Sequence, residues 1–205
     1  MRICITLDDV IRAKTAQIGK VYKKYLNPEI DLETLDITSD SLKDILGFDT
    51  EDAYNEFLYK DYAFEIFGEA PVVEKMLDKK LNLWHIRLDN IDVDEPIELI
   101  LGNAREFNTS IGFTYFFLSQ IGTRVREIYL PKDSYSIWDK CDVLVTANTS
   151  LINAVPEGKK VVRIETPYNS SVTREPDYSY ASLSAFLDDE NIIKKILNGD
   201  RNEDK

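Results

Sequence analysis

The chain has 205 residues, which is enough for one well-buried domain with room for an insertion. Its net charge is −12, and residues 29–61, with eleven acidic residues and two lysines, contribute −9 of it. Because an acidic surface repels nucleic acid, we expect no direct binding to nucleic acid. No stretch reaches the roughly 18 apolar residues of a membrane span, and the first ten residues acquire charge too early for a signal peptide. We therefore expect a cytoplasmic protein without membrane contact.

The residues that most often bind transition metals are scarce. Cys4 and Cys141 are the only cysteines and lie at or near predicted strands, so we expect two buried free thiols in a reducing compartment. His85 is the only histidine, and no second histidine or cysteine lies near it in the sequence. We expect a structural role for it.

The first third of the chain predicts one strand followed by helices. Residues 2–7 form a short apolar run before Asp8 and Asp9, which indicates a buried strand. Apolar residues then recur at helical spacing over residues 11–25, and an Asn-Pro pair ends that helix.

Residues 29–70 indicate shorter helices. One is expected over residues 42–46, capped by residues 38–40, and another follows Thr50. In the second helix Tyr54, Phe57 and Tyr62 share one face, where we expect core packing. A further helix is expected to open at Pro71.

The rest of the chain alternates strands with helices. Strands are expected at residues 97–101, 127–130, 142–146 and 160–165. Helices are expected between them, over residues 107–118, around 137–138 and over 150–154, with Gly122 ending the first. After a loop over residues 166–178, a last helix is expected from about residue 180 to residue 197.

This alternation predicts an α/β fold with a Rossmann-like, doubly wound parallel sheet. The helical stretch after the first strand is too long for a simple crossover. We therefore interpret residues 14–88 as an inserted helical cap, and residues 1–13 and 89–205 as the core. Ligands of such sheets bind beyond the carboxyl ends of the strands, which here are residues 6–9, 102–105, 131–133 and 146–148.

The first of these strand ends resembles the haloacid dehalogenase (HAD) superfamily. HAD phosphatases carry an aspartate nucleophile, one intervening residue and a second aspartate directly after strand one, and the segment ICITLDDVI resembles that motif. Its register places Thr6 at the nucleophile and Asp8 at the general acid/base. The order of cap and sheet, and residues 141–169 with their closing Pro-Tyr-Asn, are similar to the cytosolic 5'(3')-deoxyribonucleotidases. The segments DDVIRAK and FLYKDYAFEIFG resemble bacteriophage-encoded members of this group.

The resemblance implies a phosphoryl-transfer site from which most functional groups are missing. That chemistry needs a carboxylate nucleophile and Mg²⁺ held by carboxylates. Thr6 has only a hydroxyl at the nucleophile position, and Gly102 stands where the family has a Ser or Thr that holds the phosphoryl group. Thr146 and Ala147 replace the acidic pair that completes the metal site, while Lys132 takes the place of the phosphate-binding lysine.

We therefore expect no catalytic residue and no cofactor, with Asp8 a metal ligand only if Mg²⁺ binds. An alternative register makes Asp8 itself the nucleophile and puts Val10 at the acid/base position. That shift of two residues moves the apolar residues of the strand out of phase, and it restores no metal ligand at residues 146–147.

Three hypotheses for the function follow. The first is a catalytically degenerate HAD-like protein that acts through contacts with other proteins or as a homo-oligomer. If the chain is phage-encoded, it would be a virion component. The chain has eleven tyrosines, and this residue type is enriched at interfaces. The alternative is a Mg²⁺-dependent 5'-nucleotidase or phosphatase for deoxynucleotide monophosphates. It would use Asp8, Asp9 and Lys132, with Asp133 or Asp142 as a further ligand. The third is a small-molecule binder with an inert pocket.

Overall fold

The structure, a computed structural model, describes residues 1–93 and 96–198. Its centre is a sheet with the strand order β3-β2-β1-β4-β5-β6, in which all neighbouring strands are parallel. The predicted α/β class with a doubly wound sheet is thus confirmed. The strands are β1 (Arg2–Thr6), β2 (Glu98–Gly102), β3 (Glu127–Tyr129), β4 (Val143–Thr146), β5 (Lys160–Ile164) and β6 (Tyr178–Tyr180).

Helices connect these strands. The α-helices are α1 (Lys14–Tyr25), α2 (Glu51–Glu56), α3 (Leu77–Asp89), α4 (Asn108–Ile121), α5 (Thr149–Asn153), α6 (Leu183–Asp188) and α7 (Ile192–Asn198). Shorter segments are the π-helical η1 (Phe57–Asp61) and η2 (Phe64–Gly68) and the 3₁₀-helical η3 (Ser134–Lys140) and η4 (Pro167–Asn169).

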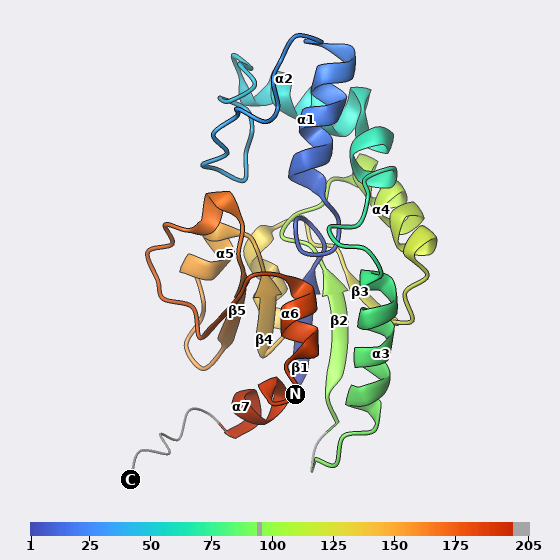
Figure 1. Ribbon diagram of the computed structural model, residues 1–205, viewed down its shortest axis with the longest axis vertical. Helices are drawn as coiled ribbons and strands as arrows, with labels where there is room; N and C mark the ends of the chain where they lie inside the picture. The colour runs from blue at the N-terminus through green and yellow to red at the C-terminus, as the bar shows by residue number, and fades with distance from the viewer. Residues whose placement is uncertain (94–95, 199–205) are drawn as a thin grey trace.

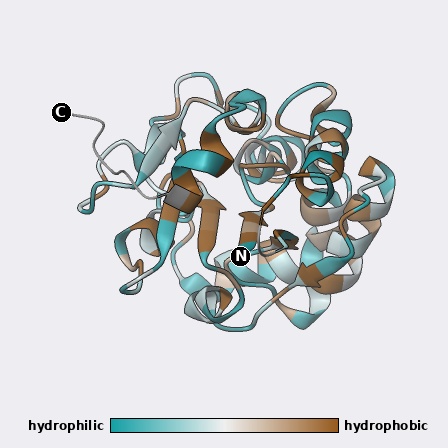
Figure 2. Cartoon of the chain, turned by 90° about the horizontal axis from the view of Figure 1, so that it is seen from below, coloured by the Kyte–Doolittle hydropathy of each residue, from teal (hydrophilic) through white to brown (hydrophobic). Residues whose placement is uncertain are grey.

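The sheet is buried on both faces, as parallel sheets are. Ile3 and Ile5 of β1 pack on one face with apolar residues of α3, α4, α6 and α7, which we call the sheet cluster. Cys4, between them, packs on the other face with residues of η3 and α5. In Figure 1, α3 and α6 lie in front of the sheet, and in Figure 2 the central strands have the brown of hydrophobic residues. Both cysteines are buried and free, as expected.

A separate apolar cluster lies above the carboxyl ends of the strands (Figure 1). This cap cluster contains buried side chains of α1, α2, η1 and η2, among them Ile18, Tyr54, Phe57 and Phe67. Tyr54 and Phe57 are therefore core residues, as predicted, and Tyr62 packs against them in a partly buried position.

Helix α3 does not belong to the cap cluster, although the predicted insertion over residues 14–88 includes it. Its buried side chains, Leu77, Leu81, Trp84 and Leu88, are part of the sheet cluster. Helical periodicity predicts that a helix forms but not which surface it covers. The division into core and cap stays a prediction, and the packing of α3 favours a cap that ends near Pro71.

Two chain segments pair where the cap cluster joins the sheet. The backbone N–H of Ala13 donates to the Pro71 carbonyl at 2.9 Å, and that of Val73 donates to the Ile11 carbonyl at 2.8 Å. Arg12 and Val72 form an antiparallel bridge between these contacts. Because residues 71–73 are extended here, α3 begins at Leu77 and not at Pro71 as predicted.

Other predicted elements differ in detail. Tyr178–Tyr180 pairs with β5 as an edge strand, so the predicted last helix is wrong at its start. The rest of that predicted helix is divided into two helices, α6 and α7. Residues 43–47 form turns instead of the predicted helix over residues 42–46. Thr50 caps α2 by accepting from the Ala53 N–H, and Gly122 ends α4 with a φ of 60°, both as predicted. In the part of the chain described here, no helix is long and apolar enough to span a membrane.

Candidate functional site

A small polar cavity lies where β1, β2 and β4 end, on the edge at which doubly wound sheets bind ligands. Its volume is about 120 Å³, and we call it the Asp8 cavity. The sheet side contributes Thr6, Asp8, Asn103 and Asn148, and the segments of the cap cluster contribute Asp40 and Tyr59. The Asn148 amide donates to Asp40 at 2.9 Å, and burial raises the pKa of Tyr59 to about 12.

Both oxygens of the Asp8 carboxylate are engaged by groups of this chain. Its Oδ1 accepts from Arg12 Nε at 2.9 Å and from Arg12 Nη2 at 2.6 Å. Its Oδ2 accepts from the Asn103 amide at 3.0 Å and lies 3.1 Å from Lys14 Nζ. Three hydrogen bonds and the ion pair with Lys14 thus engage both oxygens of the carboxylate. Burial alone would raise the pKa of Asp8, but the charges of Arg12 and Lys14 outweigh it and hold the pKa well below the ordinary value.

Arg12 connects this carboxylate to the interior. Its side chain is completely buried, and all five N–H donors are used. Besides Asp8, Nη1 donates to the Phe67 carbonyl and the Thr114 hydroxyl, and Nη2 donates to Glu106 at 3.1 Å. Glu106 is also fully buried and accepts from Asn103, Ser110 and Thr114. Asp8, Arg12, Lys14 and Glu106 thus form a network of two negative and two positive charges, in which Arg12 uses all of its donors.

Asp9 begins the connection to α1. Its φ of 58° lies in the left-handed region, which favours glycine and is tolerated by aspartate. The backbone at this position therefore suits a small residue such as glycine. Its carboxylate accepts from the backbone N–H and the hydroxyl of Thr15, at 2.8 Å and 2.5 Å, and from the Tyr168 hydroxyl at 2.8 Å. Asp9 therefore fixes the first turn of α1 against the loop after β5.

The predicted motif positions Thr6, Gly102 and Thr146 do lie together. Thr6 pairs with Gly102 in the sheet, and its hydroxyl donates to the Thr146 hydroxyl at 3.1 Å. Both threonines are buried, so their hydroxyls satisfy each other inside the protein. A Cβ on Gly102 would lie 3.0 Å from Cys4 Sγ and 3.0 Å from the Tyr129 carbonyl oxygen, so a serine or threonine there requires these neighbours to shift.

Lys132 and the other candidate ligands lie elsewhere. Lys132 is exposed and lines a neighbouring surface pocket with Arg105, not the Asp8 cavity. Asp133 accepts from the Tyr135 N–H at the start of η3. Asp142 accepts from the Arg2 N–H at 2.7 Å, at the amino end of β1. The structure therefore does not bring these three residues to Asp8.

Sequence reasoning missed the residues that neutralise Asp8. Arg12 and Lys14 follow Asp8 at positions i+4 and i+6, and these two nearby basic residues are a sequence signal for an ion pair with Asp8. Glu106 and Asn103 come just after β2, inside or next to the predicted ligand-binding segment.

Magnesium, which HAD phosphatases use, does not fit the residues at this edge. The Asp8 oxygens are occupied by N–H donors, and Thr6 and Thr146 offer only hydroxyls that bond to each other. No cluster of three His, Cys, Asp or Glu side chains that could hold a metal occurs among residues 1–93 and 96–198. Mg²⁺ prefers charged oxygen ligands in octahedral geometry. Asp9 and Asp40 also line the cavity, but Asp9 accepts from Thr15 and Tyr168, and Asp40 accepts from Asn148.

Comparisons with known proteins agree with the topology. A scan against protein-family models and a search of curated proteins find no match. Among solved structures, a haloacid dehalogenase-like hydrolase from Burkholderia xenovorans LB400 is similar, with 11% identity, a TM-score of 0.52, and coverage of 92% of this chain and 95% of that one. A 2-haloacid dehalogenase from Pseudomonas syringae pv. Tomato DC3000 matches with 10% identity, a TM-score of 0.41, and coverage of 96% and 98%. Together with the strand order, the first of these likenesses shows that the chain has the Rossmann-like fold of the HAD-like hydrolases.

Proposed function

We propose that this chain is a catalytically degenerate HAD-like protein that acts through protein contacts. The observation that carries the proposal is the occupied carboxylate of Asp8. Both Asp8 oxygens are engaged by Arg12, Asn103 and Lys14, which disfavours metal binding there and attack on phosphorus. Its lowered pKa also disfavours the protonated form that a general acid needs. Both registers of the motif therefore lead to the same conclusion.

An exposed aromatic surface supports contacts with protein. Phe64 of η2 and Phe116 of α4 are 37% and 40% exposed, and their ring centroids lie 5.4 Å apart. Phe113 adds a third ring, edge-on to Phe64. These three residues form what we call the α4–η2 surface. Aromatic residues are enriched in protein interfaces, and exposed apolar groups of this kind often mark them.

An enzyme assay tests the catalytic half of the proposal. The purified protein is incubated with p-nitrophenyl phosphate and with deoxynucleotide monophosphates, each with Mg²⁺, beside the variant Asp8→Asn. We expect no phosphate release above the buffer for either protein. Release that Asp8→Asn abolishes would contradict the proposal and favour the 5'-nucleotidase alternative, in which Asp8 takes part in catalysis.

The contact half is tested by light scattering after size-exclusion chromatography. If a second copy of the chain is the partner, the mass should exceed that of a monomer and should fall to it in Phe116→Asp. The matched control Tyr135→Asp changes a side chain that is 52% exposed but lies in η3, away from this surface, and should leave the mass unchanged. A monomeric mass at every concentration would contradict self-association. Genes for virion components beside this one would support the predicted phage origin.

A further inference from the structure

A second, larger cavity lies beside the Asp8 cavity. Its volume is about 320 Å³, within the range of small-molecule sites, and we call it the Glu74 cavity. It lies between the paired segments that lead to the cap cluster and the loops that follow β5 and β6. Most of the wall is apolar and includes Val10, Ile37, Val73, Ile164 and Leu183.

The charged groups in this wall are all acidic. Asp9, Glu74 and Glu165 line the cavity, and its lining includes no lysine, arginine or histidine. Asp9 is occupied by Thr15 and Tyr168, and Glu165 pairs with Arg163 at 3.4 Å.

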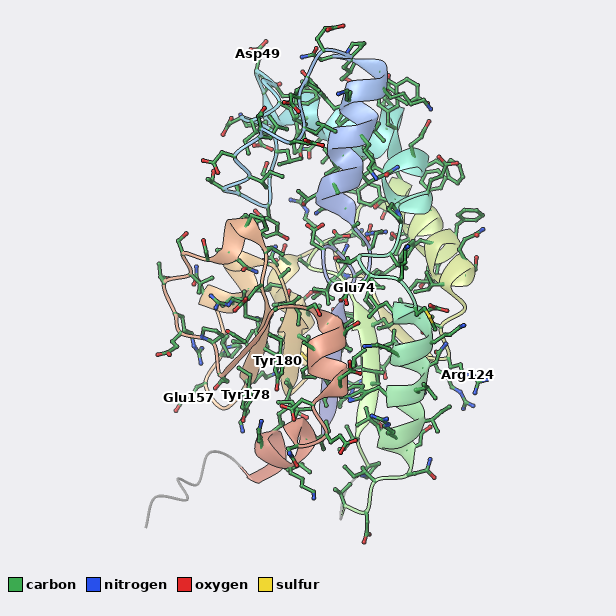
Figure 3. All side chains as sticks on the ribbon, in the orientation of Figure 1. Asp49, Glu74, Arg124, Glu157, Tyr178 and Tyr180 are labelled. Atoms are coloured by element: carbon green, nitrogen blue, oxygen red, sulfur yellow. The ribbon has the colours of Figure 1, made fainter. Side chains whose placement is uncertain are left out.

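Glu74 differs because only one of its two carboxylate oxygens accepts a hydrogen bond from the described part of the protein. Its Oε1 accepts from the Ser184 N–H at 3.3 Å, and in the described part of the chain no basic group lies within ion-pair distance of it. Glu74 is half-buried, and Figure 3 places it between the helices of the cap cluster and the sheet. Thr166 also lines the wall, but its hydroxyl oxygen is buried within the protein.

From this combination we infer that the Glu74 cavity binds a small organic ammonium ion with an aliphatic body. The ammonium group donates to the free Glu74 oxygen, and the hydrocarbon contacts the apolar wall. An anion would meet three carboxylates, and a neutral apolar molecule would bury the Glu74 charge with only the Ser184 N–H as its partner, which is unfavourable. The inference does not depend on whether the Asp8 cavity is catalytic.

An isosteric series of probes tests the inference. Hexylamine, hexanol and hexanoate have the same chain length and differ in charge, and their dissociation constants are measured by isothermal titration calorimetry at pH 7. We expect hexylamine to bind at least about tenfold more tightly than hexanol, since a hydrogen bond to a charged group contributes that much, and we expect no binding of hexanoate. Equal binding of hexylamine and hexanol, or no binding of hexylamine, would overturn the inference.

Two variants assign the binding to this cavity. Glu74→Gln should weaken hexylamine binding about tenfold and leave hexanol unchanged, whereas Glu157→Gln should change neither. Glu157 is exposed at the lower left edge of the molecule in Figure 3, away from Glu74 near the centre, and is a matched control. Ala16→Leu places a larger side chain of α1 at the cavity wall and should weaken both ligands without changing charge. Undiminished hexylamine affinity in Glu74→Gln would refute the assignment.

Discussion

Arg12 is the residue with the largest expected effect on stability. It is a buried cation between Asp8 and Glu106, so replacing it with an apolar residue leaves the buried Glu106 without an ion pair and Asp8 with Lys14 alone. We expect Arg12→Met to lower the free energy of unfolding by about 3–5 kcal/mol. Arg2→Met is the control, because Arg2 pairs with Glu98 and Glu127 at the surface and its loss should cost about 1 kcal/mol or less. Urea denaturation measures both, and equal losses would contradict the structural role of Arg12.

Asp8 makes stability depend on pH in a defined direction. Its pKa is lower in the folded protein than in the unfolded chain, so the unfolded state binds the proton more readily. The contribution of Asp8 is therefore fully present above its unfolded pKa of about 4 and is lost as the pH falls further. We expect the unfolding free energy of the wild type to decrease more steeply below pH 4 than that of Asp8→Asn. Parallel curves from denaturant titrations between pH 7 and pH 3 would refute this prediction.

The start of α3 provides a test at the level of one element. Met76 precedes the helix with a φ of 63°, in the left-handed region, and is 58% exposed. A non-glycine residue pays about 1–2 kcal/mol for this conformation, so we expect Met76→Gly to stabilise the protein. Leu83 in the middle of the same helix is equally exposed, and Leu83→Gly should destabilise it by about 1 kcal/mol. Thermal unfolding compares the two, and a shift of the same sign in both would contradict the argument.

The sequence predicts long, regular elements well and short or paired ones poorly. β1, β2, β4 and β5 are compact apolar runs, and burial on both faces explains that pattern. β6 has only three residues, and its pairing with β5 depends on tertiary structure. The extended segment at residues 71–73 is set in the same way by its contacts with residues 11–13, which no local pattern indicates.

In the candidate site, too, the features set by local sequence pattern are predicted, and those set by tertiary contacts are not. Strand alternation identifies the edge at which Thr6, Asp8 and Thr146 meet, because parallel strands end on one side of the sheet. It does not predict that Arg12 turns inward, since a charged residue is normally expected at the surface. Its burial requires Glu106 and Thr114, which are 94 and 102 residues away in the chain.

For the molecule as a whole, the separate cap and sheet clusters predict unequal local stability. The cap cluster is the smaller one, and the chain enters and leaves it through residues 11–13 and 71–73. Regions with fewer buried contacts open more readily. By hydrogen exchange with mass spectrometry, we expect the amides of α1 and α2 to exchange faster than those of β1 and β4. Equal protection throughout would show that the chain opens as one unit.

Cavity-forming variants make this prediction sharper. Ile18→Ala removes a buried side chain of the cap cluster, and Val145→Ala removes one of the sheet cluster. The two segments that connect the cap cluster to the rest of the chain are anchored at the sheet. If the sheet cluster unfolds, the cap cluster therefore loses its anchor as well. If the cap cluster unfolds, the sheet cluster stays packed. We therefore expect Ile18→Ala to accelerate exchange in α1 and α2 only, and Val145→Ala to accelerate it in both regions. If Ile18→Ala accelerates exchange in β4 to the same extent, the two clusters unfold together and the proposed division into cap and core is not a division in stability.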